Sequence, residues 1–133
     1  EFLLSKILDA KDLDELTSLI ELRPIEDNTT PTYPLGRNSI DILLINTLIP
    51  YKYAYALRRH KEEDAQHAIT LMEHIHAEDN TIVRQWRTLG QQVKTAADSQ
   101  ALIHLYQHYC QHHKCINCEV GYKVFEEKQL KLF

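Results

Sequence analysis

The sequence predicts an all-α fold, a compact bundle of about five to seven helices. Leucine and isoleucine far outnumber valine, and the 133 residues include only three glycines and four prolines. Long apolar side chains with few chain breakers suit helices, whereas strands favour valine, threonine and aromatic residues, and hairpins need turn residues. Apolar residues also recur at helical spacing along most of the chain.

Size and composition are those of an ordinary globular domain. One domain over residues 1–133 is expected, because this length is close to that of a single core. The apolar share of 44% and the charged share of 26% exclude disorder as the main state. No apolar run approaches the ~18 residues of a membrane span, and the net charge of −4 argues against a dedicated nucleic-acid binder. We therefore expect a cytoplasmic protein without a membrane partner.

The first residues predict two short helices followed by a long connection. Residues 2–8 form the first, and Asp12 is placed to cap the second, with Glu15 at the capping-box position. Because the helical pattern begins at Glu1 without an initiator methionine, we expect a fragment of a longer protein. Residues 22–38 contain proline, glycine and a polar run, which predicts a flexible loop. The inward stripe of the second helix is Leu13, Leu16, Leu19 and Ile20.

The most apolar stretch, residues 40–49, predicts the central helix of the bundle. Ser39 is placed as its N-cap, and apolar side chains lie nearly all round its circumference, which is typical of a buried helix. Pro50 lacks the N–H that would bond to the carbonyl of Asn46. We therefore expect a kink or a restart at Pro50, with the Asn46 side chain helping to satisfy the freed groups.

Three amphipathic helices are predicted after this stretch. They cover residues 62–76, residues 81–89 and a segment that Asp98 or Ser99 caps. Asn80 and Gly90 are the start and stop signals of the middle helix. The residues from 122 to 133 fit a strand, a helix or a packed tail. The expected inward positions are Ala65, Ala68, Ile69, Met72 and Ile75, then Ile82, Val83, Trp86 and Leu89, then Leu102, Leu105, Tyr106 and Tyr109.

All three cysteines lie in one short segment, residues 110–121, which we name the cysteine knuckle. Cys110, Cys115 and Cys118 have the spacing C-x4-C-x2-C. Thiolates of a C-x-x-C turn can point at one ion, and zinc with one added histidine fits better than an iron–sulfur cluster, which usually takes four cysteines. His113 is the first candidate for that histidine, because it shares the side of Cys110 if the helix persists that far. The other candidates are His112 and, at a distance, His60, His67, His74 or His76.

Other interpretations of these residues stay open. The cysteines can be small buried apolar residues, or Cys115 and Cys118 can form a redox dithiol. His104, His108 and His112 follow one another at intervals of four residues, so adjacent pairs can chelate a transition metal. Such a row of histidines is more often a solvated helix face.

No catalytic signature occurs in the sequence. Phosphate-binding glycine loops, nucleophile elbows and the H-E-x-x-H zinc motif are absent. The basic run 58–61 and the pair Arg84 and Arg87 beside Trp86 carry charges that can contact phosphate or stack on bases. In an acidic chain these charges are more simply a solvated surface. Whether the protein is an enzyme is therefore left open, with a non-catalytic role favoured for this fragment.

Four segments are familiar in combination. They are LGRNSIDILLINTLIP at 35–50, AEDNTIVRQW at 77–86, DSQALI at 98–103 and YCQHHKCINCEVG at 109–121. Together they resemble the C-terminal part of an uncharacterised bacterial family catalogued as domain of unknown function 2851. The resemblance implies a longer chain whose preceding part looks like a restriction-type nuclease core. It brings no catalytic residue to this chain.

The function that we expect is that of a structural or interaction domain. The cysteine knuckle would fasten its last helix, with zinc as the cofactor that the knuckle takes. The expected partners are the remainder of its own longer chain or another protein. The alternative is an accessory domain of a nuclease-like enzyme, in which Arg58, Lys61, Arg84 and Arg87 guide nucleic acid. A thiol redox sensor is the third hypothesis.

Overall fold

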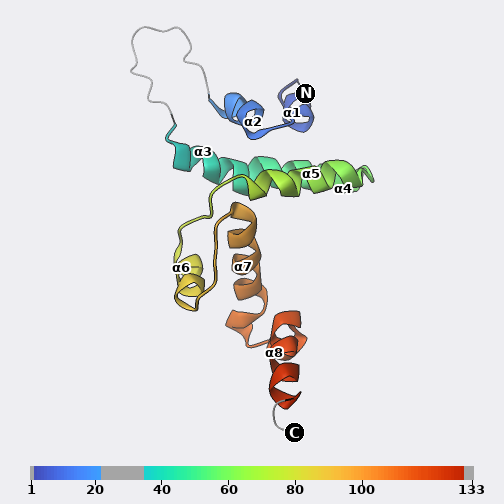
Figure 1. Ribbon diagram of the computed structural model, residues 1–133. Coiled ribbons are helices and arrows are strands. Elements are labelled where there is room, and N and C mark those ends of the chain that lie inside the picture. The colour runs from blue at the N-terminus through green and yellow to red at the C-terminus, as the bar shows by residue number, and fades with distance from the viewer. Residues whose placement is uncertain (1, 22–34, 131–133) are drawn as a thin grey trace. The chain divides into compact units, whose positions relative to one another are not determined.

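The computed structural model describes residues 2–21 and 35–130, and these residues are predominantly helical (Figure 1). In this part of the chain the only β-type pairing is an isolated bridge between His76 and Thr95. The predicted all-α class is therefore confirmed. The elements in chain order are α1 (Phe2–Asp9), α2 (Leu13–Ile20), α3 (Arg37–Leu43), η1 (Leu44–Leu48), α4 (Ile49–Arg58), α5 (Glu62–Glu73), α6 (Thr81–Thr88), α7 (Ala96–His108), η2 (Cys110–His112), η3 (Cys115–Asn117) and α8 (Glu119–Leu130).

The described residues pack into two compact units. Unit 1 comprises the described residues up to His76 together with residues 95–97. Unit 2 comprises residues 77–94 and the described residues from Asp98 onward. None of the described helices is both long enough and apolar enough to span a membrane.

The cap that the sequence predicted for α2 is present. Asp12 has an extended backbone, and its Oδ1 accepts a hydrogen bond of 2.8 Å from the N–H of Glu15. The carboxylate of Glu15 accepts a hydrogen bond of 2.8 Å from the N–H of Lys11. In the usual capping box the donor would be the N–H of the N-cap residue itself, here Asp12. Two of the free N–H groups at this helix start are thereby satisfied.

The central helix begins earlier than predicted, and Ser39 is not its N-cap. Gly36 occupies that position, and its carbonyl accepts from the N–H groups of Ser39 (2.9 Å) and Ile40 (3.2 Å). Ser39 therefore lies within the first turn of α3. Of the predicted flexible loop at 22–38, residues 22–34 lie outside the described part of the chain, and the helix already includes its last two residues.

The helix does not restart at Pro50. The backbone keeps right-handed helical angles through Leu48 and Ile49, and η1 is a π-turn in which the N–H of Ile49 bonds to the carbonyl of Leu44. A π-turn lets the helix pass a residue without an N–H, because the hydrogen bonds reach one residue further back. The Asn46 side chain donates from Nδ2 to the carbonyl of Ile42 at 3.1 Å, one turn before the Asn46 carbonyl to which Pro50 cannot donate.

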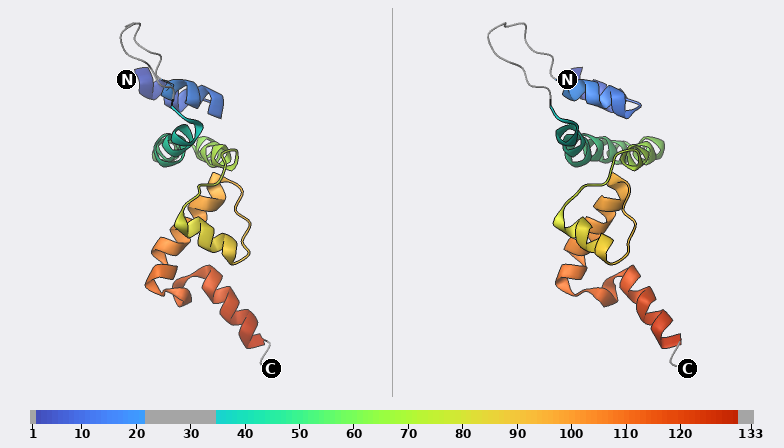
Figure 2. Two further views of the ribbon diagram at one scale, coloured as in Figure 1. Left: turned by 90° about the vertical axis from the view of Figure 1, so that its left-hand side faces the viewer. Right: turned by 60° about the vertical axis from the view of Figure 1, so that its left-hand side comes forward.

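The core of unit 1 is formed by aliphatic side chains of α1 to α5, and α4 and α5 lie side by side in it (Figures 1 and 2). The prediction that the central helix is buried all round is wrong, because Ile42 and Leu43 are 46% and 40% exposed. On α5 the inward face is turned slightly from the predicted one: Leu71 is buried and Ile69 is 39% exposed. The buried core residues are Ile7, Ala10, Leu16, Ile40, Leu44, Ile45, Ile49, Ala68, Leu71, Ile75 and Ala96.

Unit 2 begins with the predicted cap of α6. The Asn80 side chain accepts from the N–H of Val83 at 3.0 Å, and Gly90 ends the segment with a φ of +89°, the left-handed region that suits glycine. Val83 is buried as predicted. Leu89, which was expected to face inward, is 77% exposed because it already lies beyond the last helical residue.

α7 starts earlier than the sequence predicted. The helix begins at Ala96, so Asp98 and Ser99 lie inside its first turn instead of capping it. Both side chains accept from backbone N–H groups: Asp98 from Lys94 at 3.0 Å and Ser99 from Glu78 at 3.2 Å. These bonds attach the segment around α6 to α7 within unit 2.

Candidate functional site

The three cysteines lie on the turns that connect α7 to α8. The α-helix ends at His108, Cys110 opens η2, Cys115 opens η3, and Cys118 immediately precedes α8. Backbone hydrogen bonds fix the turns, from the N–H of Cys118 to the carbonyl of Cys115 (3.3 Å) and from the N–H of Tyr122 to the carbonyl of Cys118 (2.8 Å). The second of these bonds makes Cys118 the acceptor for the first turn of α8.

The cysteines all border one small cavity of about 130 Å3 in unit 2. Cys118 is buried, Cys110 is half-buried, and Cys115 is exposed. The remaining walls are apolar or aromatic, apart from glycine, so the sulfurs are the atoms that could bind a soft metal there. We name this feature the cysteine cavity. Its other lining residues are Trp86, Leu105, Tyr109, Val120 and Gly121.

Gly121 lets α8 approach the knuckle closely. A Cβ at this position would collide with the backbone carbonyl of Cys115, which leaves room only for glycine. The first turn of α8 therefore packs directly on η3. The sequence offered the glycine three residues after Cys118 but no means of predicting this contact.

The surroundings of Cys110 favour its neutral thiol. Burial raises the pKa of the Cys110 thiol, and negative charge on Cys118 and Cys115 would raise it further. In residues 2–21 and 35–130, no group of three or more histidine, cysteine, aspartate or glutamate side chains is arranged to hold a metal ion. The three cysteines border one cavity, and Cys115 is the exposed one of the three. The zinc site itself stays a prediction.

The histidine candidates lie away from the cysteine cavity lining. The helix does not persist to His113, which is exposed and has a left-handed backbone with a φ of +54°. His112 is also exposed, at the end of η2. On α7, His104 and His108 stack with ring centroids 4.2 Å apart, on the exposed side of the helix.

The basic residues considered for nucleic acid are mostly paired with carboxylates. Arg84 and Arg87 approach Asp79 at 3.8 and 3.5 Å, and Lys61 approaches Asp64 at 3.3 Å. Arg87 also donates to the carbonyl of Val93 at 3.2 Å. All of these side chains are at least 40% exposed, so the ion pairs contribute little to stability.

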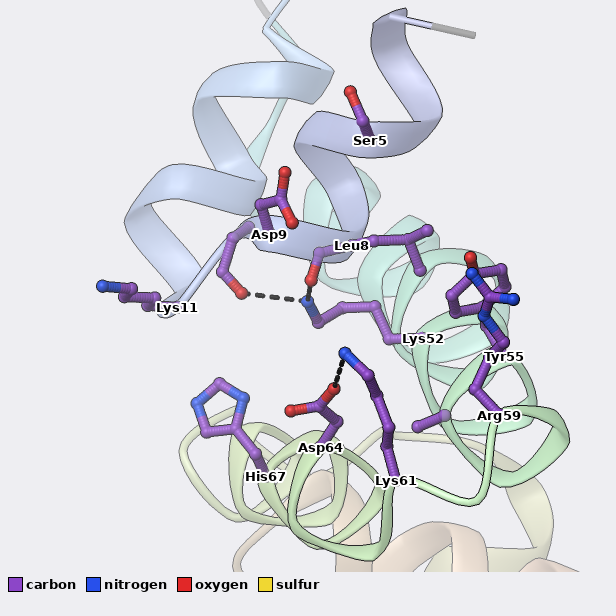
Figure 3. Close-up of a pocket in the computed structure, with 12 residues that line it drawn as sticks. Ser5, Leu8, Asp9, Lys11, Lys52, Tyr55, Arg59, Lys61, Asp64 and His67 are labelled. Atoms are coloured by element: carbon purple, nitrogen blue, oxygen red, sulfur yellow. Dashed lines mark hydrogen bonds and ion pairs between the residues drawn. The ribbon is translucent and has the colours of Figure 1, made fainter.

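A larger pocket lies in unit 1, and the sequence analysis missed it. It has a volume of about 490 Å3 and is bordered by α1, α4, α5 and the turns that follow α1 and α4 (Figure 3). We name it the Lys52 pocket, after the lysine at its inner wall. Its lining residues are Ser5, Leu8, Asp9, Ala10, Lys11, Lys52, Tyr55, Ala56, Arg59, Lys61, Asp64 and His67.

Lys52 is a buried cation that joins α4 to the end of α1. Its side chain is on α4, only 6% of the residue is exposed, and its Nζ donates to the carbonyls of Ile7 (2.9 Å), Leu8 (2.7 Å) and Ala10 (2.9 Å). An ammonium group has three donors, so all of them are used. Burial lowers the pKa of Lys52, and the carboxylates of Asp64, Asp9 and Glu15 oppose that shift. In the sequence this lysine stands between two tyrosines and carries no sign of burial.

The comparisons with known proteins give one match. Residues 2–81 match the family described as "Protein of unknown function (DUF2851)", which is more than half of the chain. No curated protein and no solved structure matches. The matched segment contains the whole lining of the Lys52 pocket and ends before the cysteine cavity. Of the four segments that carried the resemblance, 35–50 lies inside the match, 77–86 lies partly inside it, and the last two lie beyond it.

Proposed function

The chain belongs to the DUF2851 family of proteins of unknown function, and we propose that it acts as a structural and interaction module rather than as a catalyst. The observation that carries this proposal is that Cys110, Cys115 and Cys118 border one cavity between α7 and α8. In the proposal the cysteines fasten α8 to the rest of unit 2 by binding a structural zinc ion.

The thin core of unit 2 supports a need for such a fastening. The buried residues among its described positions are Val83, Val93, Ser99 and Cys118. Small domains with little buried apolar surface are commonly stabilised by a metal or by disulfides. Because the cysteines are free thiols in the structure, a metal is the fastening that they can provide without oxidation.

Zinc binding requires a rearrangement of the knuckle. The three cysteines already border the cysteine cavity, whereas His113 is exposed and outside its lining, so both the thiols and this histidine have to turn toward one point. Three thiolates then supply three of the four ligands of a tetrahedral site, and His113 is our candidate for the fourth. Zinc displaces the thiol protons on binding, so the raised pKa of Cys110 makes the affinity for zinc increase with pH.

Elemental analysis of freshly purified protein tests this proposal. We expect about one zinc per chain, lost in Cys118→Ser and reduced in His113→Ala. Trp86 is the only tryptophan and borders the cysteine cavity, so its emission should change when zinc is removed by a chelator. His104→Ala is the matched control, because it removes one ring of the exposed histidine pair and should leave the zinc content unchanged.

Two outcomes would reject the zinc proposal. The first is freshly purified protein without stoichiometric metal that also fails to take up added zinc with a Trp86 response. The second is zinc that disappears in His104→Ala and persists in Cys118→Ser, which would assign the metal to the helix surface. In either case the cysteines are packing residues of unit 2.

The second candidate function is that of an accessory nucleic-acid contact. It is favoured by a depression of about 460 Å3 on α4, lined by Tyr51, Ala54, Tyr55, Arg58 and Arg59. The rings of Tyr51 and Tyr55 lie 6.3 Å apart, and aromatic rings beside arginines are typical of surfaces on which bases stack. Arg58 is thus the member of the predicted basic set that lines this depression, and Arg84 and Arg87 do not line it.

Binding of a labelled single-stranded oligonucleotide tests the second candidate. We expect salt-dependent binding that Arg58→Ala weakens, because a contact with phosphate is lost. Arg84→Ala is the control and should leave the affinity nearly unchanged. Absence of binding at low salt, or equal losses in the two variants, would reject this candidate.

A further inference from the structure

The Lys52 pocket has the dimensions of a small-molecule site. Its volume of about 490 Å3 falls within the range of roughly 300–1,000 Å3 that is typical of ligand pockets. Its walls come from α1, α4 and α5 of the same unit, so the site does not depend on any contact outside unit 1. Figure 3 shows charged side chains arranged around this hollow from all three helices and the adjoining turns.

The charge of the lining is opposite to that of the protein. Four cationic side chains, Lys11, Lys52, Arg59 and Lys61, face two carboxylates, Asp9 and Asp64. His67 adds a further positive charge when it is protonated. The pocket therefore carries a surplus of two positive charges in a chain whose net charge is −4. Such a local surplus concentrates anions.

The four cations divide into one fixed charge and three potential donors. All three donors of Lys52 are used on carbonyls, so it contributes positive potential but no hydrogen bond to a ligand. Neither Lys11 nor Arg59 is paired with a carboxylate in the described part of the chain. Lys61 pairs with Asp64, but both side chains are more than 60% exposed, and such pairs contribute little and exchange readily.

One side of the pocket suits an organic group. Leu8, Ala10 and Ala56 supply aliphatic lining, and the ring of Tyr55 lies beneath the guanidinium of Arg59 at 5.6 Å. Contact with the ring holds the arginine side chain, which reduces the conformational entropy lost when the guanidinium binds an anion. The pocket thus offers cationic donors beside an apolar wall.

We propose that the Lys52 pocket binds a small organic phosphate monoester, with Lys11, Arg59 and Lys61 donating to the phosphate and Tyr55 and Leu8 contacting the organic group. A phosphate monoester carries a charge of about −1.5 to −2 at neutral pH and presents three terminal oxygens. Its charge matches the surplus of the lining, and its oxygens match the three available donors. This inference is independent of the cysteine cavity and of its zinc.

Titrations of the 15N-labelled full chain test the proposal with three probes. Sodium phosphate should shift the amide signals of Lys11, Tyr55 and Lys61 beyond the effect of sodium chloride at equal ionic strength. Adenosine monophosphate should shift the same signals and bind more tightly than phosphate, because its organic part adds contacts. Adenosine without the phosphate should leave the signals nearly unchanged at the same concentration.

Two arginines of unit 1 provide the matched variants. Arg59→Ala should weaken the binding of adenosine monophosphate about tenfold, the usual loss for one charge-assisted hydrogen bond. Arg37→Ala removes the same charge from α3, at a position that lines neither the Lys52 pocket nor the depression on α4, and should change the affinity less than about twofold. Circular dichroism of both variants verifies that the helices are retained.

Four results would overturn the proposal. The first is amide shifts no larger with phosphate and adenosine monophosphate than with chloride, and the second is equal affinities for adenosine monophosphate and adenosine. The third is equal losses in Arg37→Ala and Arg59→Ala, and the fourth is binding of an oligonucleotide without binding of either phosphate probe. The last result would assign the basic side chains to a macromolecular surface instead of to a pocket.

Discussion

The two units of this chain are stabilised by different means. Unit 1 buries a continuous set of aliphatic side chains and includes a buried lysine whose ammonium group is fully hydrogen-bonded. Unit 2 has few buried side chains, and its helices are connected by two short 3-10 turns that carry the cysteines. Apolar burial supplies most of the stability of a folded domain, so the core of unit 2 contributes less stabilisation than the core of unit 1.

This difference indicates where each unit is vulnerable. In unit 1 the sensitive point is polar: one cation satisfies the carbonyls at the end of α1. In unit 2 the sensitive point is steric, at the close contact between Gly121 and the knuckle. Substitutions at these contacts should therefore destabilise the two units to different extents.

Substitution of Lys52 should have the largest effect. Lys52→Met removes the hydrogen-bond donor from three carbonyls at once. Each unsatisfied buried group costs roughly 1–3 kcal/mol, and burial of the apolar methionine side chain offsets part of this cost. We therefore expect the free energy of unfolding of unit 1 to fall by about 3 kcal/mol. Urea denaturation followed by circular dichroism measures the change. Lys11→Met, at an exposed position, should alter stability by less than ~0.5 kcal/mol. A Lys52→Met variant as stable as the original would show that water replaces the ammonium group.

Substitution of Gly121 should be the next largest. Gly121→Ala places a Cβ against the carbonyl of Cys115, and a forced contact of this kind costs about 2 kcal/mol. Denaturation followed by Trp86 fluorescence reports the change in unit 2. Gly36→Ala is the control, because no atom lies within 4 Å of the added Cβ, and it should cost under ~1 kcal/mol. Equal effects in the two variants would contradict the close packing of α8 on η3.

The sequence predicted the local features of both units better than their tertiary contacts. The caps by Asp12 and Asn80 follow from short-range hydrogen bonds, and the structure has both. The short spacing of the cysteines predicted that they lie near one another but not the cavity that they border. The assignment of His113 depended on a helix that continues past His108, and the structure turns into 3-10 geometry instead. Helix ends are decided by the surrounding packing as well as by the local sequence.

The Lys52 pocket shows what periodicity cannot predict. Lys52 bonds to carbonyls that are 42 to 45 positions away in the sequence, so its burial depends on how α1 meets α4. An isolated lysine in an amphipathic helix is normally exposed. The exposed Ile42 and Ile69 illustrate the same limit, because an apolar stripe gives the direction of a helix face only approximately.

The N-caps provide a smaller and matched perturbation of the two units. Asp12→Ala and Asn80→Ala each remove one cap bond of similar length, 2.8 and 3.0 Å, and each should cost about 1 kcal/mol. Asp12→Ala should shift the unfolding curve of unit 1 measured by circular dichroism, and Asn80→Ala the curve measured by Trp86 fluorescence. The exchanges Asp12→Asn and Asn80→Asp retain a capping oxygen and should cost less. A Trp86 curve that moves with Asp12→Ala as much as with Asn80→Ala would show that the two units unfold as one.

The smallest expected effect is the pH dependence of Cys110 in zinc-free protein. Burial raises the pKa of this thiol in the folded chain, so its alkylation rate should reach half its maximum at a higher pH in the folded than in the urea-unfolded protein. The unfolded state then loses the proton first as pH rises. The stabilising contribution of the protonated thiol is therefore complete below the ordinary pKa of cysteine, and it is lost as pH rises through the raised, folded-state value.

Removal of the neighbouring thiols separates the two causes of that shift. Burial is the larger cause, and charge on Cys118 and Cys115 is the smaller one. The double variant Cys115→Ser, Cys118→Ser should therefore keep most of the difference in pH between the folded and unfolded rate profiles of Cys110. If the folded and unfolded rate profiles coincide in the double variant, charge on the neighbouring thiolates is the main cause of the raised pKa. That result would place the three sulfurs close to one another.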